Sequence, residues 1–323
     1  MRILVQLALL SVSITYENLT EDENQIRLSN CGYGLQESFE TKPGFTFEMP
    51  PKHWLAVVRL LQNDNPLPGY TIGTFISSRH ILTSSKIISD FYQNTWNKSF
   101  PDETGLAPGM NYLWVQIEES MTDMSLAVGR RHRDDDPLLD YLKVESALVL
   151  HFSGPSDVNT KYSPMIIELN EHHDGPLPCL SENSVNSDIQ PADNVQIYGR
   201  SSLVYDNKTH IDRELSTIDR VTVDRRFITV KTAVIKNDSG GPLIRMEGDR
   251  KTVIGIAAEA NSSCQQSACG EMHYFDLRFY AEHICKITGI CPHPSETSFT
   301  MSSTSPPSTS SKPKKRKCLE SWQ

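Results

Sequence analysis

The sequence predicts an all-β body that ends in a single helix. From Trp54 onward, short strand-like runs alternate with Gly, Pro, Asn and Asp, which is typical of a barrel or a sandwich. A helical period occurs near the end, at about residues 277–286. An apolar share of 38% fits a globular chain rather than a disordered one. The clearest strand-like runs are Trp54–Leu61, Tyr70–Ile76, Tyr112–Ile117, Ala147–His151, Val195–Tyr198, Phe227–Ile235 and Thr252–Ala258.

The first residues have the pattern of a secretory signal peptide. Two residues that include one arginine precede a mostly apolar run at 3–14, which is too short to span a bilayer. Small residues then offer a cleavage site near Ser13 or Thr15. The alternative is a buried N-terminal strand. A net charge of -9 argues against attraction to nucleic acid or to an anionic membrane. No later segment has the roughly 18 unbroken apolar residues that a membrane helix requires, so we expect a secreted, soluble protein that does not span a membrane.

Cysteines and sequons agree with secretion. Seven cysteines would mostly pair in an oxidising compartment, although spacing alone does not determine the pairing. Proximity favours Cys264–Cys269 and Cys285–Cys291, which leaves Cys31 for Cys179 and Cys318 unpaired. There is no CxxC or HxxxH spacing, so no metal or cofactor is expected. The expected glycosylation sites are Asn18, Asn97, Asn207 and Asn261.

Composition divides the chain into four parts. A signal peptide at 1–15 precedes a polar segment at 16–50, which contains Cys31. The globular body covers 51–291. The remainder, 292–323, is rich in Ser, Thr and Pro, ends in a basic run, and is expected to be disordered. Such a tail could carry O-glycans, undergo dibasic processing, or tether the protein to mucus or matrix.

The motif that bears most directly on function is Asp238-Ser239-Gly240-Gly241-Pro242. A serine that hydrolyses peptides needs a base to take its proton, a carboxylate to orient that base, and donors for the developing oxyanion. Ser239 is the candidate nucleophile. Asn237 also begins a sequon, which we expect to be unmodified because it is buried.

Segments upstream resemble the chymotrypsin/trypsin-like serine proteases. Trp54–Leu60 and Gly73–Lys86 are similar to the first barrel, where a strand ending L-T-A-A-H-C delivers the histidine. Val144–Leu150 is similar to the D-I-A-L-L-x-L strand that delivers the aspartate. Pro178–Leu180 is similar to the inter-barrel P-I-C-L segment. The cysteine of that segment pairs with an upstream cysteine, which Cys31 resembles.

The resemblance covers about residues 50–290 and is closest to secreted nematode-type trypsin-like proteins. It implies two six-stranded antiparallel β-barrels, at about 51–165 and 166–291, that meet at a cleft.

Within this resemblance, the catalytic positions are substituted. Lys86 occupies the histidine position and Glu145 the aspartate position. A carboxylate beside a lysine keeps the proton on the amine, so we expect a Lys86–Glu145 ion pair in place of a working base. Two alternatives are a Ser–Lys dyad and a displaced alignment in which His80 serves.

Other positions also depart from the pattern. The resemblance implies an oxyanion hole formed by Asn237 and Ser239, in which Asn237 replaces the family's glycine. No activation sequence precedes Trp54, so that Asp238 lacks the amino terminus it would normally receive. The specificity pocket would be formed by Ala233, Ala258, Glu259 and Ala260. We therefore expect an inactive protease homologue that binds a protein or peptide. The alternative is an active serine endopeptidase with a non-standard base.

Overall fold

The computed structural model describes most of the body and part of the N-terminal segment. The described residues belong to one compact unit, 1–293, and the predicted tail lies outside them. No helix among these residues combines the length and apolar character that crossing a membrane demands. The described ranges are 18–35, 46–49, 53–89, 99–100, 110–115, 124–130, 140–152, 162–181, 195–201, 211–216, 221–224, 226–231 and 239–291 without 262–270.

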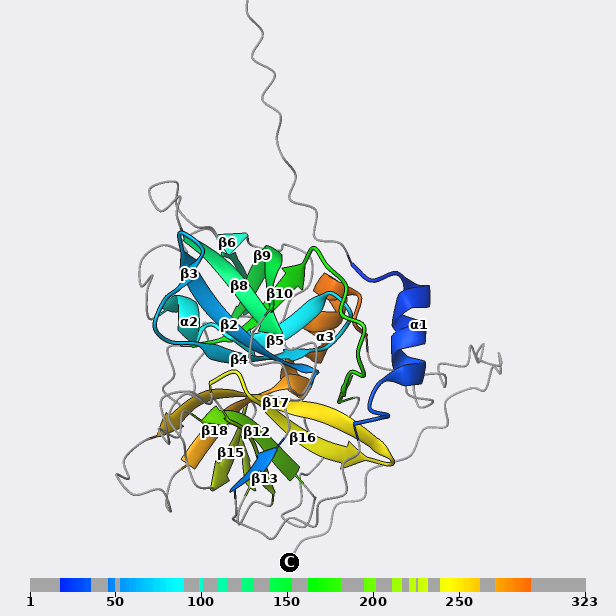
Figure 1. Cartoon of the computed structure of the whole chain (residues 1–323). Coiled ribbons are helices and arrows are strands. Elements are labelled where there is room, and N and C mark those ends of the chain that lie inside the picture. The colour runs from blue at the N-terminus through cyan, green and yellow to red at the C-terminus, as the bar shows by residue number, and fades with distance from the viewer. Residues whose placement is uncertain are drawn as a thin grey trace, which may run out of the picture. The chain divides into compact units, whose positions relative to one another are not determined.

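The first half of the body is a closed, six-stranded antiparallel barrel (Figure 1). It closes because β10 pairs both with β5 and with β9. In order round the barrel, the strands are β10 (Pro164–Leu169), β5 (His80–Ser84), β4 (Thr71–Phe75), β2 (Leu55–Gln62), β8 (Met124–Arg130) and β9 (Asp140–Phe152). Shorter strands extend it: β3 (Asn65–Pro66), β7 (Met110–Trp114) and β6 (Ser99–Phe100).

Alternation along these strands sorts their side chains into two cores. On β9, Ala147 and Val149 pack with Val58 and Met165 in one cluster. Leu148, on the opposite face of the same strand, belongs to a second cluster that also includes residues of the second sheet. Successive side chains of a strand point to opposite faces, so β9 is buried on both sides. This explains its continuous apolar run in the sequence.

The second sheet contains β11 (Cys179–Leu180), which pairs in parallel with β17, and eight antiparallel strands. Its edge strand β1 comes from the N-terminal segment and pairs with β13 through four residues. The sheet order is β1 (Thr46–Met49), β13 (Ile211–Ser216), β12 (Val195–Ser201), β16 (Pro242–Glu247), β17 (Arg250–Asn261), β18 (Glu271–Asp276), β15 (Phe227–Lys231) and β14 (Val221–Asp224).

One apolar cluster joins the two sheets and the C-terminal helix α3 (Leu277–Thr288). Trp54, just before β2, meets Tyr198 of β12 edge-on, with ring centroids 4.8 Å apart. Asp276 caps α3 by accepting from the Arg278 amide, and Gly289 ends it at a φ of 71°. The predicted fold class is confirmed: a mostly β body with a closed six-stranded barrel, a second sheet and a C-terminal helix.

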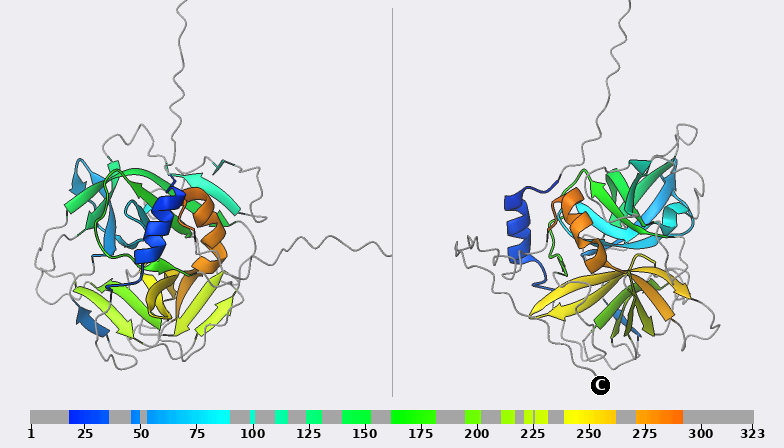
Figure 2. Two further views of the ribbon diagram at one scale, coloured as in Figure 1. Left: turned by 90° about the vertical axis from the view of Figure 1, so that its right-hand side faces the viewer. Right: turned by 180° about the vertical axis from the view of Figure 1, so that it is seen from behind.

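The sequence did not predict the helix α1 (Glu21–Asn30), although its start has a recognisable signal. Thr20 and Glu23 form a capping box, in which each side chain receives a hydrogen bond from the other residue's backbone amide. Figure 2 shows α1 beside α3. The Leu19 amide donates to the Thr288 carbonyl at 2.8 Å, which fastens the start of α1 to the end of α3.

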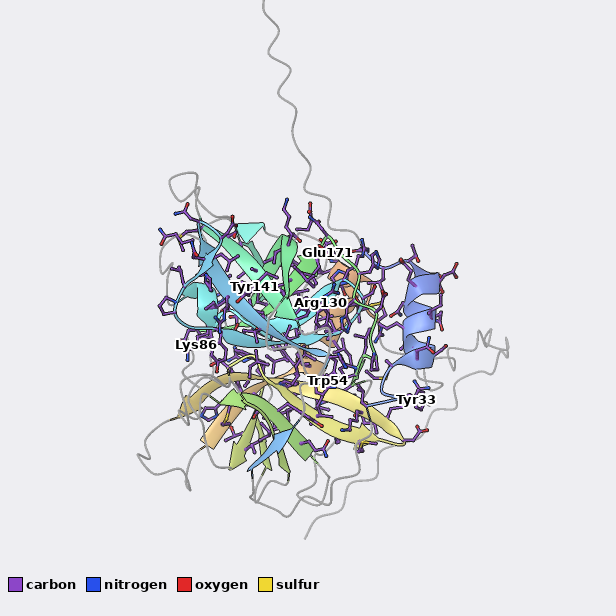
Figure 3. The ribbon with its side chains drawn as sticks, in the orientation of Figure 1. Tyr33, Trp54, Lys86, Arg130, Tyr141 and Glu171 are labelled. Atoms are coloured by element: carbon purple, nitrogen blue, oxygen red, sulfur yellow. A yellow bond between two sulfur atoms is a disulfide. The ribbon has the colours of Figure 1, made fainter. Side chains whose placement is uncertain are left out.

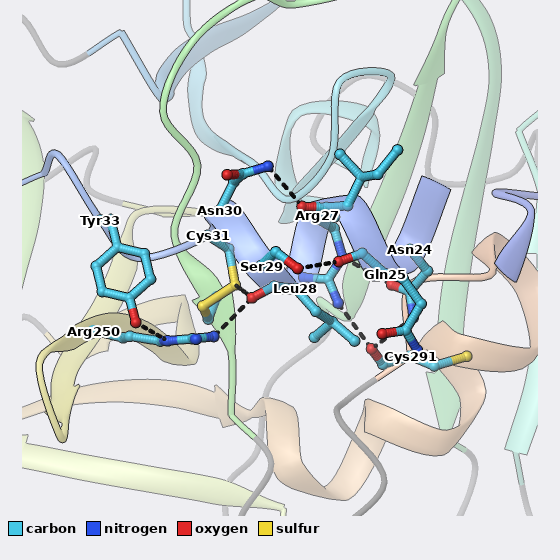
Figure 4. Close-up of a disulfide and its surroundings, with 12 residues drawn as sticks. Asn24, Gln25, Arg27, Leu28, Ser29, Asn30, Cys31, Tyr33, Arg250 and Cys291 are labelled. Carbon is cyan, nitrogen blue, oxygen red and sulfur yellow. Dashed lines mark hydrogen bonds between the residues drawn. A yellow bond between two sulfur atoms is a disulfide. The ribbon is translucent and has the colours of Figure 1, made fainter. Parts of the chain in front are cut away.

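One disulfide and two polar side chains hold residues 18–35, which comprise α1 and the turn after it and which we call the N-terminal strap. The predicted pairs Cys31–Cys179 and Cys285–Cys291 are both formed. Arg27 and Asn24 donate to the Cys291 carbonyl at 2.8 and 3.2 Å, as Figure 4 shows. The strap is therefore part of the folded body.

Candidate active site

Ser239 lies in a turn wedged between the barrel and the second sheet. Its carbonyl accepts from the Ile72 amide of β4 at 2.9 Å, and the Gly240 amide donates to the Ala257 carbonyl of β17 at 2.8 Å. Gly240 has a φ of 83°, and a Cβ there would lie 2.0 Å from the Ile72 carbonyl oxygen. Only glycine fits this position. The turn is thus locked in place, and Ser239 is buried, with 5% of its surface exposed.

Lys86 follows β5 and begins the short helix α2 (Lys86–Ser89). Its ammonium lies 5.8 Å from the centroid of the Tyr162 ring, and the side chain is half-buried. Figure 3 shows Lys86 at the edge of the barrel that faces the second sheet. β5 also contributes Thr83, whose hydroxyl would lie 2.6 Å from a Cβ on Gly240. The strand that precedes Lys86 therefore adjoins the Ser239 turn.

Glu145 does not meet Lys86. It is an exposed residue of β9 and lines an open groove of about 720 Å³ with Tyr141, Lys143 and Leu126. The ion pair predicted between Lys86 and Glu145, both of them described residues, is absent. The physical reason is strand order: β10 lies between β9 and β5 in the barrel, so a β9 residue is one strand too far away.

The residue that adjoins the end of β5 is Ser163. The Ser85 amide donates to the Ser163 carbonyl at 2.9 Å, and the Ser163 amide donates to the Ser85 hydroxyl at 3.0 Å. Ser163 also begins a stretch, ending at Leu169, that matches D-I-A-L-L-x-L with serine in the aspartate place. The apolar residues at 165–167 mark a second candidate strand in the sequence, with a run similar to that at 147–150.

A histidine on β9 contacts Ser163 from the other side. The Nδ1 atom of His151 lies 3.3 Å from the Ser163 hydroxyl oxygen. Burial lowers the pKa of His151, which favours its neutral form. Beside the end of β5 the structure thus places a hydroxyl and a histidine, and no hydrogen bond from Ser163 to a carboxylate occurs among the described residues.

His80 stands at the wrong end of β5 to act as the base. With a rise of about 3.3 Å per residue, it lies about 13 Å from Ser84. Its Nδ1 is 2.8 Å from the Ser77 hydroxyl, and burial lowers its pKa to about 3. His80 is therefore a buried, neutral residue of a turn.

The structure covers only part of the predicted oxyanion hole and specificity pocket. Ala258 is fully buried in β17, and Glu259 and Ala260 follow it after a bulge. Asn261 ends that strand opposite Glu271. No group of three or more potential metal ligands occurs within the described ranges. Outside those ranges lie Ala233, Asn237, Asp238, Asn97, Asn207, the Cys264–Cys269 pair and Cys318.

The barrel, the second sheet and the Ser239 turn between them define a trypsin-like protein. The model of the nematode trypsin-6-like family matches residues 1–291, and the chain belongs to this family. No curated protein matches the sequence.

Proposed function

We propose that this chain is a secreted trypsin-like serine protease homologue without peptidase activity, which acts as a protein-binding scaffold in defence or extracellular regulation. The observation that carries the proposal is the pair Lys86 and Ser163. They occupy the positions from which a base and its orienting carboxylate would serve Ser239. Neither side chain suits its role.

The surroundings of Lys86 differ from those of a lysine that acts as a base. A lysine becomes a base when desolvation or nearby positive charge removes its proton. Lys86 is only half-buried, and the negative face of the Tyr162 ring attracts an ammonium. Ser163 offers no charge that could hold a base in the right tautomer and orientation. These features argue against a Ser–Lys dyad.

The disulfides support the secreted part of the proposal. Cys31–Cys179 joins residues 148 apart in sequence, and Cys285–Cys291 closes the end of α3. Structural disulfides persist in oxidising compartments, which agrees with a signal peptide at 1–15. We place the segment that precedes the body at 16–50, the body at 51–291 and the tail at 292–323. Glycosylation at Asn97, Asn207 and Asn261, and pairing of Cys264 with Cys269, belong to the same proposal.

One observation favours the rival function, an active serine endopeptidase. The Ser239 turn keeps its glycine at a φ of 83° and its hydrogen bonds to both sheets. A well-ordered turn at the nucleophile is what an unusual hydrolase would need. It is also what packing between the two sheets requires, so the turn alone does not imply catalysis.

A fluorophosphonate probe distinguishes the two functions. The full chain, recovered from the medium of eukaryotic cells, is treated with the probe beside Ser239→Ala and beside trypsin as a positive control. We expect no labelling of the native protein above the level of Ser239→Ala. Labelling that disappears in Ser239→Ala would establish a reactive serine and overturn the proposal.

A further inference from the structure

The sequon Asn18-Leu19-Thr20 lies at the start of the N-terminal strap. Asn18 and Thr20 are exposed, whereas Leu19 between them is fixed to the body. The Leu19 amide donates to Thr288, and a Cβ on Gly289 would approach the Leu19 carbonyl oxygen to 2.3 Å. The strap therefore holds the Asn18 amide at the surface, at a defined place beside the ends of α1 and α3.

Thr20 has a second role in the folded protein. Its hydroxyl accepts from the Glu23 amide at 3.2 Å, and its own amide donates to the Glu23 carboxylate at 2.7 Å. These bonds satisfy donors at the start of α1. The hydroxyl also donates to the Glu23 carboxylate at 2.9 Å, so the capping role needs both an acceptor and a donor, which Asn also supplies. The sequon requires a hydroxyl, so the two roles of Thr20 can be separated by substitution.

A groove of about 270 Å³ runs along α1 from this point. Leu19, Glu23 and Ile26 line one side at helical spacing, and Arg79 and His172 are on the other. Ile26 is 63% exposed, one of two large apolar side chains exposed among the described residues. The lining combines one apolar surface with charged groups that form hydrogen bonds.

We propose that Asn18 carries an N-linked glycan whose first sugar residues lie in this groove. A pyranose ring has an apolar face and a rim of hydroxyls, which match Ile26 and the flanking Glu23, Arg79 and His172. The groove begins at Leu19, next to the attachment point, and continues along α1 to Asn30; the ten residues of α1 span about 15 Å at 1.5 Å per residue. Covering Ile26 in this way removes an apolar side chain from water.

The attachment is a glycosyl transfer before the chain folds, when the Thr20 hydroxyl is not yet engaged by Glu23. The Asn18 amide nitrogen bonds to the anomeric carbon of an oligosaccharide carried on a lipid diphosphate. The bond from that carbon to the phosphate oxygen breaks, the lipid diphosphate leaves, and the amide loses one proton. The inference rests on the proposed secretion, because this donor is met only in the secretory pathway.

The test uses the full chain expressed in insect cells and recovered from the medium, with the occupancy of Asn18 measured by glycopeptide mass spectrometry. The native chain and Thr20→Ser should carry the glycan in at least half of the molecules. Asn18→Gln and Thr20→Asn should carry none, and Thr20→Asn should keep the thermal stability of Asn18→Gln because Asn still caps α1.

Placement in the groove is tested by the rate at which peptide N-glycosidase releases the Asn18 glycan. Release from the native fold should be at least tenfold slower than from denatured protein. Ile26→Glu should speed release from the native fold at least threefold. Gln25→Ala, an exposed α1 substitution away from the groove, should leave the rate unchanged.

Each failure has its own meaning. A chain that never reaches the medium and bears no glycan at any sequon contradicts the proposed secretion, and this inference falls with it. A secreted chain with unmodified Asn18 overturns the glycosylation site alone. If Asn18 is glycosylated but Ile26→Glu leaves the rate of glycan release unchanged, the placement of the sugars in the groove is wrong.

Discussion

The assignment of the third catalytic position to Ser163, rather than to Glu145, can be tested by partial reconstruction of a triad. The starting point is Lys86→His, which supplies an imidazole at the end of β5. Removing the carboxylate from a complete triad lowers kcat about 10⁴-fold, or about 5.5 kcal/mol at 1.36 kcal/mol per factor of ten. Lys86→His alone should therefore remain inactive.

Adding a carboxylate at position 163 should restore some reactivity of Ser239, because Ser163 is hydrogen-bonded to Ser85, next to position 86. We expect Lys86→His/Ser163→Asp to react with a fluorophosphonate at least tenfold faster than Lys86→His. The full 10⁴-fold gain is not expected, since a defective oxyanion hole costs about 2.7–4 kcal/mol. The assay is the pseudo-first-order rate of labelling at Ser239, followed by intact mass.

The matched control is Lys86→His/Glu145→Asp, which places an aspartate on β9. It should label no faster than Lys86→His, because β10 separates β9 from β5. If the Glu145→Asp variant reacts as fast as the Ser163→Asp variant, or if Ser163→Asp brings no gain, then Ser163 does not adjoin the base and the reasoning from strand order is refuted.

Three further predictions concern stability, each measured by chemical denaturation. Loss of Cys31–Cys179 by double serine substitution should cost up to about 5 kcal/mol, against about 2 for Cys285–Cys291, because the closed loops contain 148 and 6 residues; equal losses would contradict this. Gly240→Ala should cost roughly 2–5 kcal/mol, from a positive φ and a backbone clash, whereas the exposed Gly248→Ala should cost only the strain of its φ. His80 has a folded pKa of about 3 against an ordinary 6.5, so the unfolded chain binds the extra proton between these values. Stability should fall as pH drops below 6.5, by up to about 1.4 kcal/mol per unit, and His80→Asn should flatten that slope.

The sequence was most informative where local pattern and chain order suffice. Alternation and turn residues predicted the β body, and helical spacing predicted α3. The helix α1 was missed although its capping box is visible at Thr20 and Glu23. Its apolar periodicity is weak, because α1 is held by a disulfide and by hydrogen bonds from Arg27 and Asn24 rather than by an apolar face.

The same distinction between local pattern and tertiary pairing applies to the candidate site. The sequence by itself determined that a glycine-rich turn carries Ser239 and that Lys86 follows the strand that would deliver a base, because both follow from contiguous motifs. Only the tertiary structure decided which strand adjoins Lys86. That choice depends on pairing between residues about 80 positions apart, such as Ser85 and Ser163. Two strands with similar apolar runs, β9 and β10, cannot be ranked by pattern, and the closure of the barrel through β10 is what places Ser163 at the site.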